Sequence, residues 1–582
     1  MPNVRKIKPV SDVAVEPHDA GGDEMALVVE GLTTVTRSLA AANAQLAQLA
    51  RTLGPRVAGE PDSIVRLAPA PAAASVNTWE SDPFSEATPT LNPALAPSIA
   101  VNAPVNANPA LRTTIAEPQP PSGRYQPGTL GFRYWTAAEA LARGINFWSA
   151  LLPSGTTWST ANPMRISLVE PGQNLNANYS RANGLRFYHS VVGAFDVHSC
   201  ESPAVVNHEL GHAVLDALRP QLFNAASDEV GAFHESFGDM SAILTALQSP
   251  SFRAKVLAET SGRIHVNSRL SRVAEQLGWA IRQSSPRLVD VDALRNASNR
   301  FFYRRPALLP PMANANVLSS AAHSFSRVFT GAFLDALANM LTTTGAATED
   351  NLLKVSRDMG QILVDAIHTA PITNAYFGQV AAAMVQAQQA RHGGRYRTAL
   401  NSAFVRRGIL SVTSSMALAD APIPEAKPIA AVKGMAGADF GAQDMLQYGA
   451  AAPDEAFRLG LGETPDLPLR ATRLGPLDIQ VHAPDDTPMF EVAPATFGMQ
   501  PADDPGADTL TFLEGLIQRG QIDTSARGTG ELLAMRELVP EQRHTDSVDI
   551  THSLVAQSGG IVLKRNHFAC GFCQQARGRR CH

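Results

Sequence analysis

The residues of this sequence best suited to chemistry are two histidines four residues apart, His208 and His212. Glu209 directly follows the first of them. On a helix, residues at this spacing leave the same face, so both imidazoles can bind one zinc ion. The carboxylate of Glu209 can then take a proton from a water molecule that the metal activates. Ser202 is a suitable N-cap and Pro203 suits the first helical position, so the segment predicts a helix.

A second helix is expected to supply the third ligand. Ser227 and the acidic residues after it are typical of a helix start. On that helix Glu235 and Asp239 are again four apart, so one can bind the metal while the other orients a ligand histidine. Three protein ligands with one open position are typical of a catalytic zinc, and four of a structural one. A histidine pair alone also occurs on surfaces and in cores, and the downstream carboxylates favour the metal site.

These residues resemble the motifs of a known family. His208-Glu209-x-x-His212 followed by Gly231-Ala232-x-x-Glu235-x-x-x-Asp239 is similar to the thermolysin-like metallopeptidases, or gluzincins, and less closely to their fungalysin-type relatives. The resemblance covers residues 170–410, and 130–170 more loosely. It implies an α+β, thermolysin-like zincin domain with a small N-terminal α/β lobe, an edge strand and a mainly helical C-terminal lobe. It also implies zinc ligands at His208, His212 and Glu235, with Glu209 as general base and Asp239 behind the ligands.

Two downstream segments extend the resemblance. Residues 293–298 resemble the segment with the family's substrate-binding arginine, here Arg295, and residues 322–326 resemble the segment with its catalytic histidine, here His323. A planar guanidinium suits a substrate carbonyl, and a histidine can donate to the oxyanion that forms on it. His265 matches the histidine segment as well. However, the arginine must precede the histidine, which favours His323.

Asn176 and Ala177 resemble the pair that holds the substrate backbone in this family. They lie between two expected strands, Met164–Val169 and Leu185–Tyr188. An extended peptide can pair its amides with an exposed strand edge there, which gives affinity largely independent of side chains. The alternative is that Asn176 only forms a turn.

The sequence departs from the family pattern at several positions. Ala204 and Ala246 replace two acids of the family's calcium site, so calcium is not expected there. Phe223 replaces a tyrosine that helps to stabilise the oxyanion, Leu318 replaces an aspartate before the catalytic histidine, and His234 replaces an asparagine. Loss of the tyrosine and the aspartate is expected to slow catalysis without affecting zinc binding.

The length of 582 residues allows several domains, and 45% hydrophobic residues allow a large core. Apolar residues at helical spacing predict helices at Phe252–Leu257, Leu270–Ile281, Ser324–Leu341, Leu352–Ile367 and Ala375–Gln389. The 41 prolines and 42 glycines predict long irregular stretches outside this core. We expect a flexible N-terminus (1–24), an amphipathic helix (25–54), a Pro/Ala-rich linker or pro-region (55–127), the metallopeptidase domain (128–412) and a largely irregular C-terminal region of unknown role (413–582). Weak strands are expected in the last region at Leu477–Val481 and Phe490–Val492.

Residues 25–54 carry apolar residues at alternating steps of three and four, from Met25 to Leu53. This spacing is typical of a coiled coil or of a helix that docks on a partner, so self-association through this segment is one interpretation. The following segment, 55–127, could instead lie across an active site as a pro-region.

The four cysteines are too few for a disulfide scaffold. His567, Cys570, Cys573 and Cys581 could form a structural zinc site or a redox pair, or belong to an inert tail. Cys200 precedes the first metal histidine by eight residues. It is expected to be a small buried residue, the alternative being a thiolate that caps zinc in a latent form.

No apolar segment typical of a signal peptide follows Met1–Val10, and no apolar run reaches transmembrane length. A net charge of −5 gives no reason to expect nucleic acid or an anionic membrane as a partner. We therefore expect a cytoplasmic protein by default, or one exported without a signal peptide.

Three functions fit the sequence. The first is a zinc endopeptidase acting on peptides or proteins, with Glu209 as general base. The second is a catalytically weak or inactive zinc-binding protein on the peptidase fold, against which the intact Glu209 argues. The third is a secreted toxin or interaction protein whose peptidase processes only itself.

Overall fold

The computed structural model describes the chain in several stretches. These are residues 75–86, 94–106, 108–420, 466–474, 477–485, 505–523, 550–557 and 560–569. Every described residue belongs to one compact unit, Ala73–His582. The expected flexible start (1–24) and amphipathic helix (25–54) lie outside the described residues.

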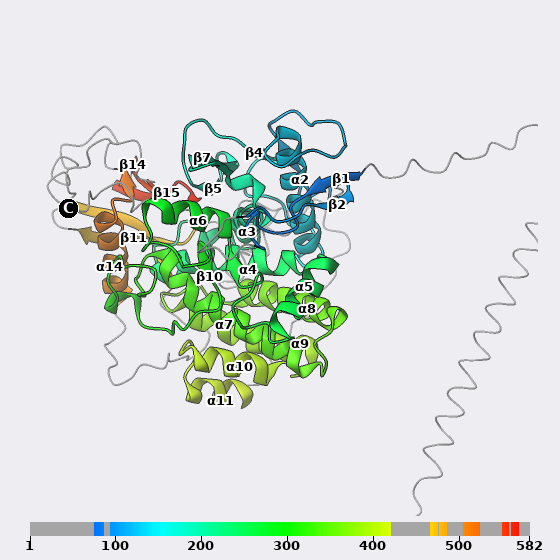
Figure 1. Cartoon of the computed structure of the whole chain (residues 1–582). Helices are drawn as coiled ribbons and strands as arrows, with labels where there is room; N and C mark the ends of the chain where they lie inside the picture. Colours follow the sequence, from blue (N-terminus) through cyan, green and yellow to red (C-terminus); the bar gives the residue numbers. More distant parts are fainter. Residues whose placement is uncertain are drawn as a thin grey trace, which may run out of the picture. The chain divides into compact units, whose positions relative to one another are not determined.

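Helices and strands are both abundant, which agrees with the expected α+β class (Figure 1). The helices are α2 (Leu130–Ser149), α3 (Pro203–Leu218), α4 (Asp228–Ala246), α5 (Pro250–Thr260), α6 (Glu275–Ser284), α7 (Ala322–Thr343), α8 (Glu349–Thr369), α9 (Tyr376–His392), α10 (Arg397–Arg406), α11 (Val412–Asp420) and α14 (Pro505–Gln518). The strands are β1 (Ser75–Thr78), β2 (Ile99–Asn102), β3 (Thr113–Ile115), β4 (Met164–Ser167), β5 (Ala177–Ser180), β6 (Gly184–Phe187), β7 (His189–Val192), β8 (Phe195–His198), β9 (Arg272–Val273), β10 (Arg295–Asn296), β11 (Leu469–Leu474), β12 (Leu477–His482), β13 (Ile522–Asp523), β14 (His552–Gln557), β15 (Gly560–Arg565) and β16 (Phe568–Ala569). None of the described helices is long and apolar enough to cross a membrane.

A five-stranded sheet with the order β16-β5-β6-β4-β3 lies beside α3. Strands β3, β4 and β6 run parallel, whereas β5 is antiparallel to β6. The sequence predicted β4 and β6 correctly, and it expected an exposed strand edge near Asn176 and Ala177, where β5 begins. The structure differs at that edge, because β16 from the far end of the described chain pairs with the outer side of β5.

Helices α3 and α4 begin at the caps that the sequence predicts. Ser202 accepts a hydrogen bond from the backbone N–H of Val205, and Pro203 follows in the first turn of α3. Ser227 accepts in the same way from Val230 at the start of α4. The two helices pack directly against each other, and they carry the predicted metal ligands (Figure 1).

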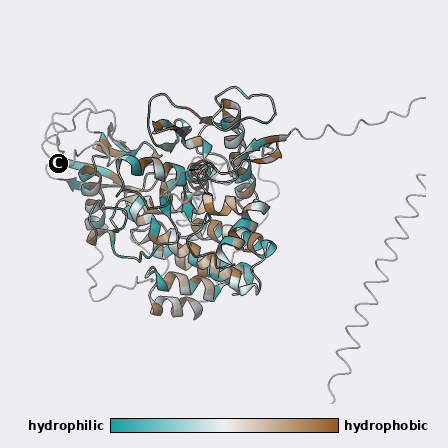
Figure 2. Ribbon diagram, in the orientation of Figure 1, coloured by the Kyte–Doolittle hydropathy of each residue, from teal (hydrophilic) through white to brown (hydrophobic). Residues whose placement is uncertain are grey.

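Helices α7, α8, α9 and α10 pack with α4 in a mainly helical layer. Their contact surfaces are aromatic: the rings of Phe325 and Phe377 stack with centroids 5.0 Å apart, and Phe329 lies 5.1 Å from Phe377. Figure 2 shows hydrophobic and hydrophilic residues alternating around these helices, as an amphipathic pattern requires. The predicted helices at Ser324–Leu341, Leu352–Ile367 and Ala375–Gln389 are therefore confirmed.

The helix expected at Leu270–Ile281 begins later than predicted. Residues Arg272–Val273 form β9, which pairs with β10, and α6 begins only at Glu275. Ala274 separates the two with a positive φ of 57°, a conformation that ends regular helix or strand structure. This irregular turn places β10, and with it Arg295, next to α4.

The described part of residues 55–127 is folded against the domain, so the expectation of a linker is wrong for it. Strand β1 pairs with β2, and the buried Trp79 packs edge-on against Phe132 of α2 with ring centroids 5.0 Å apart. The buried carboxylate of Asp82 accepts a 2.6 Å hydrogen bond from the hydroxyl of Ser202. The prediction relied on the high proline and alanine content of this segment. The few large residues that pack against the domain are too widely spaced to form a recognisable pattern.

The C-terminal region is also more ordered than expected. Its described residues form a second five-stranded sheet, β11-β12-β15-β14-β13, which packs with α14 around a small core of its own. The strand predicted at Leu477–Val481 is confirmed as β12, and Phe490–Val492 lies outside the described residues. This sheet contacts the loop before α4, where the N–H of Ala226 donates to the carbonyl of His482 at 2.9 Å.

Candidate metal centre

The structure brings His208 and His212 of α3 together with Glu235 of α4. One ligand atom from each residue lies within 4.8 Å of the others, and all three side chains are buried. The Nε2 atom of His208 lies 3.3 Å from Oε2 of Glu235, and that of His212 lies 3.8 Å from Oε1. The group could therefore hold a metal ion.

The spacing fits a tetrahedral metal with nitrogen and oxygen ligands. Ligand atoms bound to zinc at 2.0–2.2 Å in this geometry lie roughly 3.3–3.6 Å from one another. The Nε2 atoms of His208 and His212 are buried and make no hydrogen bond to the described residues. Buried nitrogens without a hydrogen-bond partner are costly, and a bound cation would satisfy both.

The protonation states of the group follow from its burial and its charges. Burial lowers the pKa of His208, but the neighbouring carboxylates of Asp239 and Glu235 outweigh this and raise it to about 9. Burial lowers the pKa of His212 to about 3, so this imidazole is neutral, as a ligand must be. Burial would raise the pKa of Glu235, but the neighbouring His323 holds it well below its ordinary value. The carboxylate is therefore ionised.

Asp239 and Arg295 support the ligand His208. The Nδ1 atom of His208 lies 2.9 Å from Oδ1 of Asp239, which leaves Nε2 free to point at the metal position. Arg295 donates from Nη2 to Oδ1 of Asp239 at 2.7 Å and from Nε to Oδ2 at 3.0 Å. Burial raises the pKa of Asp239, but Arg295 and His208 outweigh it and lower it to about 2. The structure thus places the buried Arg295 on Asp239, and its contact with a substrate stays a prediction.

The close approach of α3 and α4 depends on two glycines that the sequence analysis passed over. A Cβ atom on Gly238 would lie 2.6 Å from the ring of His208, and one on Gly211 would lie 2.9 Å from Cα of Gly238. Neither position has room for a side chain. The signal in the sequence was present, because each glycine lies directly before a residue of the centre, His212 and Asp239.

His323 lies in the first turn of α7 and reaches the ligand group. Its Nε2 atom is 3.1 Å from Oε2 of Glu235 and 2.5 Å from the backbone oxygen of Ala569. His265, the competing histidine of the sequence, is exposed in the turn after α5. The structure therefore brings His323 to the centre. Glu209 lies on α3 between His208 and His212 in the sequence, and its side chain is fully buried.

Asn176 and Ala177 lie where β5 begins. Asn176 is buried, and its side-chain oxygen accepts a hydrogen bond from the N–H of Ala177 at 2.9 Å. The neighbouring strand edge is not open, since β16 pairs with β5 through Phe568 and Ala569.

Phe568 is the residue of the centre that the sequence analysis missed. Its ring stacks on the ligand His212 with centroids 4.8 Å apart, and on His234 with centroids 3.9 Å apart. Phe223, where the family has a tyrosine, contacts the same ring edge-on at 5.5 Å. No local motif marks Phe568, because its position depends on a strand pairing across most of the domain.

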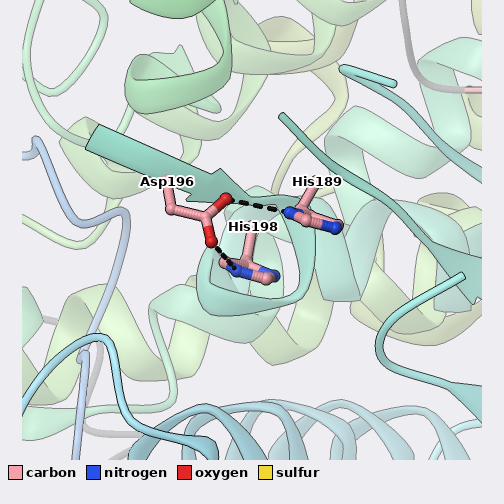
Figure 3. A group of neighbouring side chains, drawn as sticks. All are labelled: His189, Asp196 and His198. Atoms are coloured by element: carbon pink, nitrogen blue, oxygen red, sulfur yellow. Dashed lines mark hydrogen bonds and ion pairs between the residues drawn. The ribbon is translucent and has the colours of Figure 1, made fainter. Parts of the chain in front are cut away.

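A second group of potential metal ligands lies on the β7–β8 hairpin (Figure 3). His189 and His198 face each other across the hairpin with parallel rings 4.5 Å apart. Each ring lies 2.9 Å from one oxygen of Asp196, so the carboxylate bridges both. Figure 3 shows Asp196 beside the two rings, with one carboxylate oxygen directed at each of them. These hydrogen bonds account for the arrangement without a metal ion.

Ala204 and Ala246, for which the sequence predicts no calcium binding, line a cavity together with basic side chains. The residues that decide its charge are Glu80, Arg143, Arg269 and Arg272, beside Ala204 and Ala246. The carboxylate of Glu80 is already bound by the ammonium group of Lys255 at 3.0 Å. A hard cation that prefers six to eight oxygen ligands has little to bind there. Leu318 is buried in the main core and offers no charge near His323.

The cysteine hypotheses have different outcomes. Cys200 is buried, and burial raises the pKa of its thiol well above the ordinary value. It does not belong to the ligand group of His208, so it is a buried residue and not a thiolate on the metal. The tail hypothesis stays a prediction, because Cys570, Cys573 and Cys581 lie outside the described residues.

Comparison of the sequence with known proteins assigns no family to this chain. No family model matches the sequence, and no curated protein matches it. Its chemical role therefore rests on its own residues, among which a buried His-His-Glu group could hold a metal ion.

Proposed function

We propose that this protein is a zinc-dependent endopeptidase with a thermolysin-like catalytic domain. The observation that carries the proposal is the buried group of His208, His212 and Glu235, with Glu209 next to the first ligand on the same helix. Three ligands of these types leave a fourth position open, as catalytic zinc requires. Zinc bound there supplies a Lewis acid that polarises a carbonyl and makes water acidic near neutral pH.

The chain's own residues would handle the protons of the reaction. Glu209 accepts a proton from the attacking water and passes it to the departing amine. His323 donates from Nε2 to the carbonyl oxygen as negative charge develops on that atom. Asp239, held by Arg295, keeps His208 in the orientation that presents Nε2 to the metal.

Strand β5 would hold the substrate backbone. It runs past the ligand group in an extended conformation, and Asn176 and Ala177 lie at its start. Backbone pairing at such an edge binds peptides of many sequences, which suits an endopeptidase acting on peptides or proteins. Cleavage of folded proteins would need an extended segment that can reach this edge.

A second candidate is a zinc-binding protein with weak or no catalytic activity. The observation that favours it is Phe223, which packs against Phe568 and has no hydroxyl to donate to an oxyanion. On this alternative His323 alone supports the carbonyl oxygen. Removing one such donor costs about 10²–10³-fold in rate, so a single donor is compatible with slow turnover.

The test separates metal binding from catalysis. Glu209→Gln should keep the bound zinc, because the residue is not a ligand, and should abolish cleavage of a casein-like substrate. Glu514→Gln, an exposed position on α14, is the matched control and should leave both unchanged. Equal cleavage by Glu209→Gln and the wild type would reject the general base. Full zinc occupancy without cleavage in any form would favour the inactive alternative.

A further inference from the structure

Strand β16 occupies the strand edge at which a substrate would bind. It runs antiparallel to β5, with Phe568 opposite Tyr179 and Ala569 opposite Asn178. This is the geometry of strand addition, in which an extended peptide pairs its backbone with a sheet edge. The chain thus brings its own peptide to the place where a substrate is expected.

The side chain of Phe568 seats this peptide against the ligand group. Its ring stacks on His212 and His234 at interplanar angles of 17° and 19°, and it is almost completely buried. The guanidinium of Arg565 lies over the ring, 4.2 Å from its centroid. Ring contacts of this kind add affinity and fix the register of the peptide.

The carbonyl group of Ala569 points at the catalytic histidine of the proposal. Its oxygen lies 2.5 Å from Nε2 of His323. A backbone carbonyl can only accept, so Nε2 of His323 is the donor. The same nitrogen lies 3.1 Å from the ligand carboxylate of Glu235, which puts this carbonyl beside the metal ligands. A reacting carbonyl needs this combination of donor and neighbouring metal.

The C-terminal sheet holds β16 in this position. At the end of β15, Arg565 donates from its backbone to the side chain of Asn224 at 3.3 Å and from Nε to the carbonyl of Phe223 at 3.0 Å. A strand that only protects an exposed edge would not need to stack a phenylalanine on His212 or to accept a hydrogen bond from His323. The contacts match presentation of a peptide to the centre better than simple protection.

We propose that residues 566–569 are an intramolecular substrate and that the protein cleaves its own peptide bond after Ala569. This inference rests on the proposed peptidase function. The oxygen of a water molecule bonds to the carbonyl carbon of Ala569, and the C–N bond to Cys570 breaks. Glu209 carries a proton from the water to the departing amine. The products are a carboxylate at Ala569 and a new amino terminus at Cys570.

Uncut, the segment competes with every other peptide for β5. The local concentration of a tethered strand is high, so added substrates bind poorly until the segment leaves the edge. Cleavage after Ala569 removes the chain on one side of the strand. Activity toward other peptides should therefore rise after self-cleavage.

The experiment follows the full chain by intact-mass spectrometry after loading with zinc. A product ending at Ala569 should appear in the wild type and be absent in Glu209→Gln. The fraction of chains cleaved per unit time should stay constant over a tenfold range of protein concentration, because the reaction is intramolecular. A fraction cleaved per unit time that rises in proportion to concentration would overturn the intramolecular assignment.

A pair of variants tests the seat of the strand. Phe568→Ser removes both histidine contacts and should slow self-cleavage by about tenfold or more, the loss expected for two aromatic contacts. The same variant should cleave an added casein-like peptide faster than the uncut wild type does, since β5 is then open. Val555→Ser, an exposed position on β14 of the C-terminal sheet, is the matched control and should self-cleave at the wild-type rate.

The outcomes separate this inference from the proposed function. An intact bond after Ala569, in a protein that cleaves added peptide as wild type or as Phe568→Ser, overturns the inference and keeps the peptidase. Zinc-loaded protein that cleaves neither its own chain nor added peptide in any variant overturns both. If thermal melting shows Phe568→Ser to be unfolded, the wild type and Glu209→Gln decide alone.

Discussion

The Nδ1 atom of His208 lies 2.9 Å from Oδ1 of Asp239, one helical turn after the ligand Glu235. This contact joins the two helices and leaves Nε2 of His208 on the side of Glu235, where a metal ion could bind. Arg295 completes it from β10 by neutralising the buried carboxylate. The orientation of a metal ligand therefore depends on residues that do not bind the metal.

Metal content is the first expectation. Replacing His208, His212 or Glu235 by alanine should abolish tight zinc binding, whereas Asp239→Asn should weaken it by about 10–100-fold. His198→Ala, in the hydrogen-bonded group of the β7–β8 hairpin, is the control and should leave one zinc per chain. Zinc content by elemental analysis after dialysis decides. Full occupancy in Glu235→Ala would contradict the ligand assignment.

The helix crossing can be probed at two glycines of one helix. Gly238→Ala places a methyl group 2.6 Å from the ring of His208, and Gly231→Ala meets its nearest atom only at 3.6 Å. The first should destabilise the protein by about 1–3 kcal/mol and weaken metal binding, as overpacking does. The second should be neutral or stabilise the helix by up to about 1 kcal/mol. Thermal unfolding of both metal-free variants measures the difference, and equal melting temperatures would disprove a tight crossing.

The two competing histidines should behave differently. His323→Ala should lower kcat by about 10²–10³-fold with zinc retained, the loss expected for one oxyanion donor. His265→Ala should be close to neutral, because that side chain is exposed and lies apart from the ligand group. Steady-state kinetics on an added peptide compares them. The reverse pattern would move the catalytic histidine to His265.

Calcium should have little effect on stability. The cavity beside Ala204 and Ala246 presents three arginines and only one carboxylate, that of Glu80, which Lys255 already binds. Melting temperatures with and without millimolar calcium should therefore agree closely, with magnesium as the ionic-strength control. A large and saturable rise with calcium alone would show a site elsewhere.

One buried carboxyl group should make stability depend on pH. Burial raises the pKa of Glu229 to about 8, against hydrogen bonds from Tyr303 and the N–H of Phe377 that lower it. The folded state then holds one more proton than the unfolded state between pH 4.5 and 8. Stability is thus fully present below 4.5 and falls by up to about 1.4 kcal/mol per pH unit across that range.

Glu229→Gln removes this titration and keeps an acceptor oxygen for the N–H of Phe377. Its amide N–H₂ then faces the hydroxyl of Tyr303, which can accept a hydrogen bond as well as donate one. The free energy of unfolding of the variant should fall less steeply from pH 5 to 8 than that of the wild type, as measured in urea. Asp358→Asn on α8, partly exposed and far from this carboxyl, is the control. Parallel pH profiles for wild type and Glu229→Gln would contradict the raised pKa.

Local patterns predicted the parts of the centre that lie on continuous helices. The caps at Ser202 and Ser227 and the i, i+4 pairs on α3 and α4 are short-range signals, so the ligand geometry follows from them. The sequence segment around Arg295 identified this residue as part of the site, but it did not predict that Arg295 contacts Asp239. Its contact with Asp239 depends on the turn at Ala274, where the backbone adopts a positive φ without a glycine to announce it.

Long-range pairings were out of reach of the sequence. Trp79 and Asp82 belong to a segment that reads as linker by composition, yet they bury against α2 and the start of α3. Phe568 and Ala569 form a strand of only two residues, too short to show alternation. Their place beside β5 is set by the second sheet, whose packing no local motif describes.

The pairing of β16 with β5 forms late during synthesis. Strand β5 and the helices of the centre precede residues 568–569 by a long stretch of sequence, so they leave the ribosome first and can fold as they emerge. Throughout that interval the outer side of β5 has no partner from its own chain. A nascent protein of this kind carries an open strand edge next to a nearly complete metal centre, where a neighbouring polypeptide can pair first. Protection of the growing chain by a chaperone thus matters until residues 568–569 have emerged and can pair with β5.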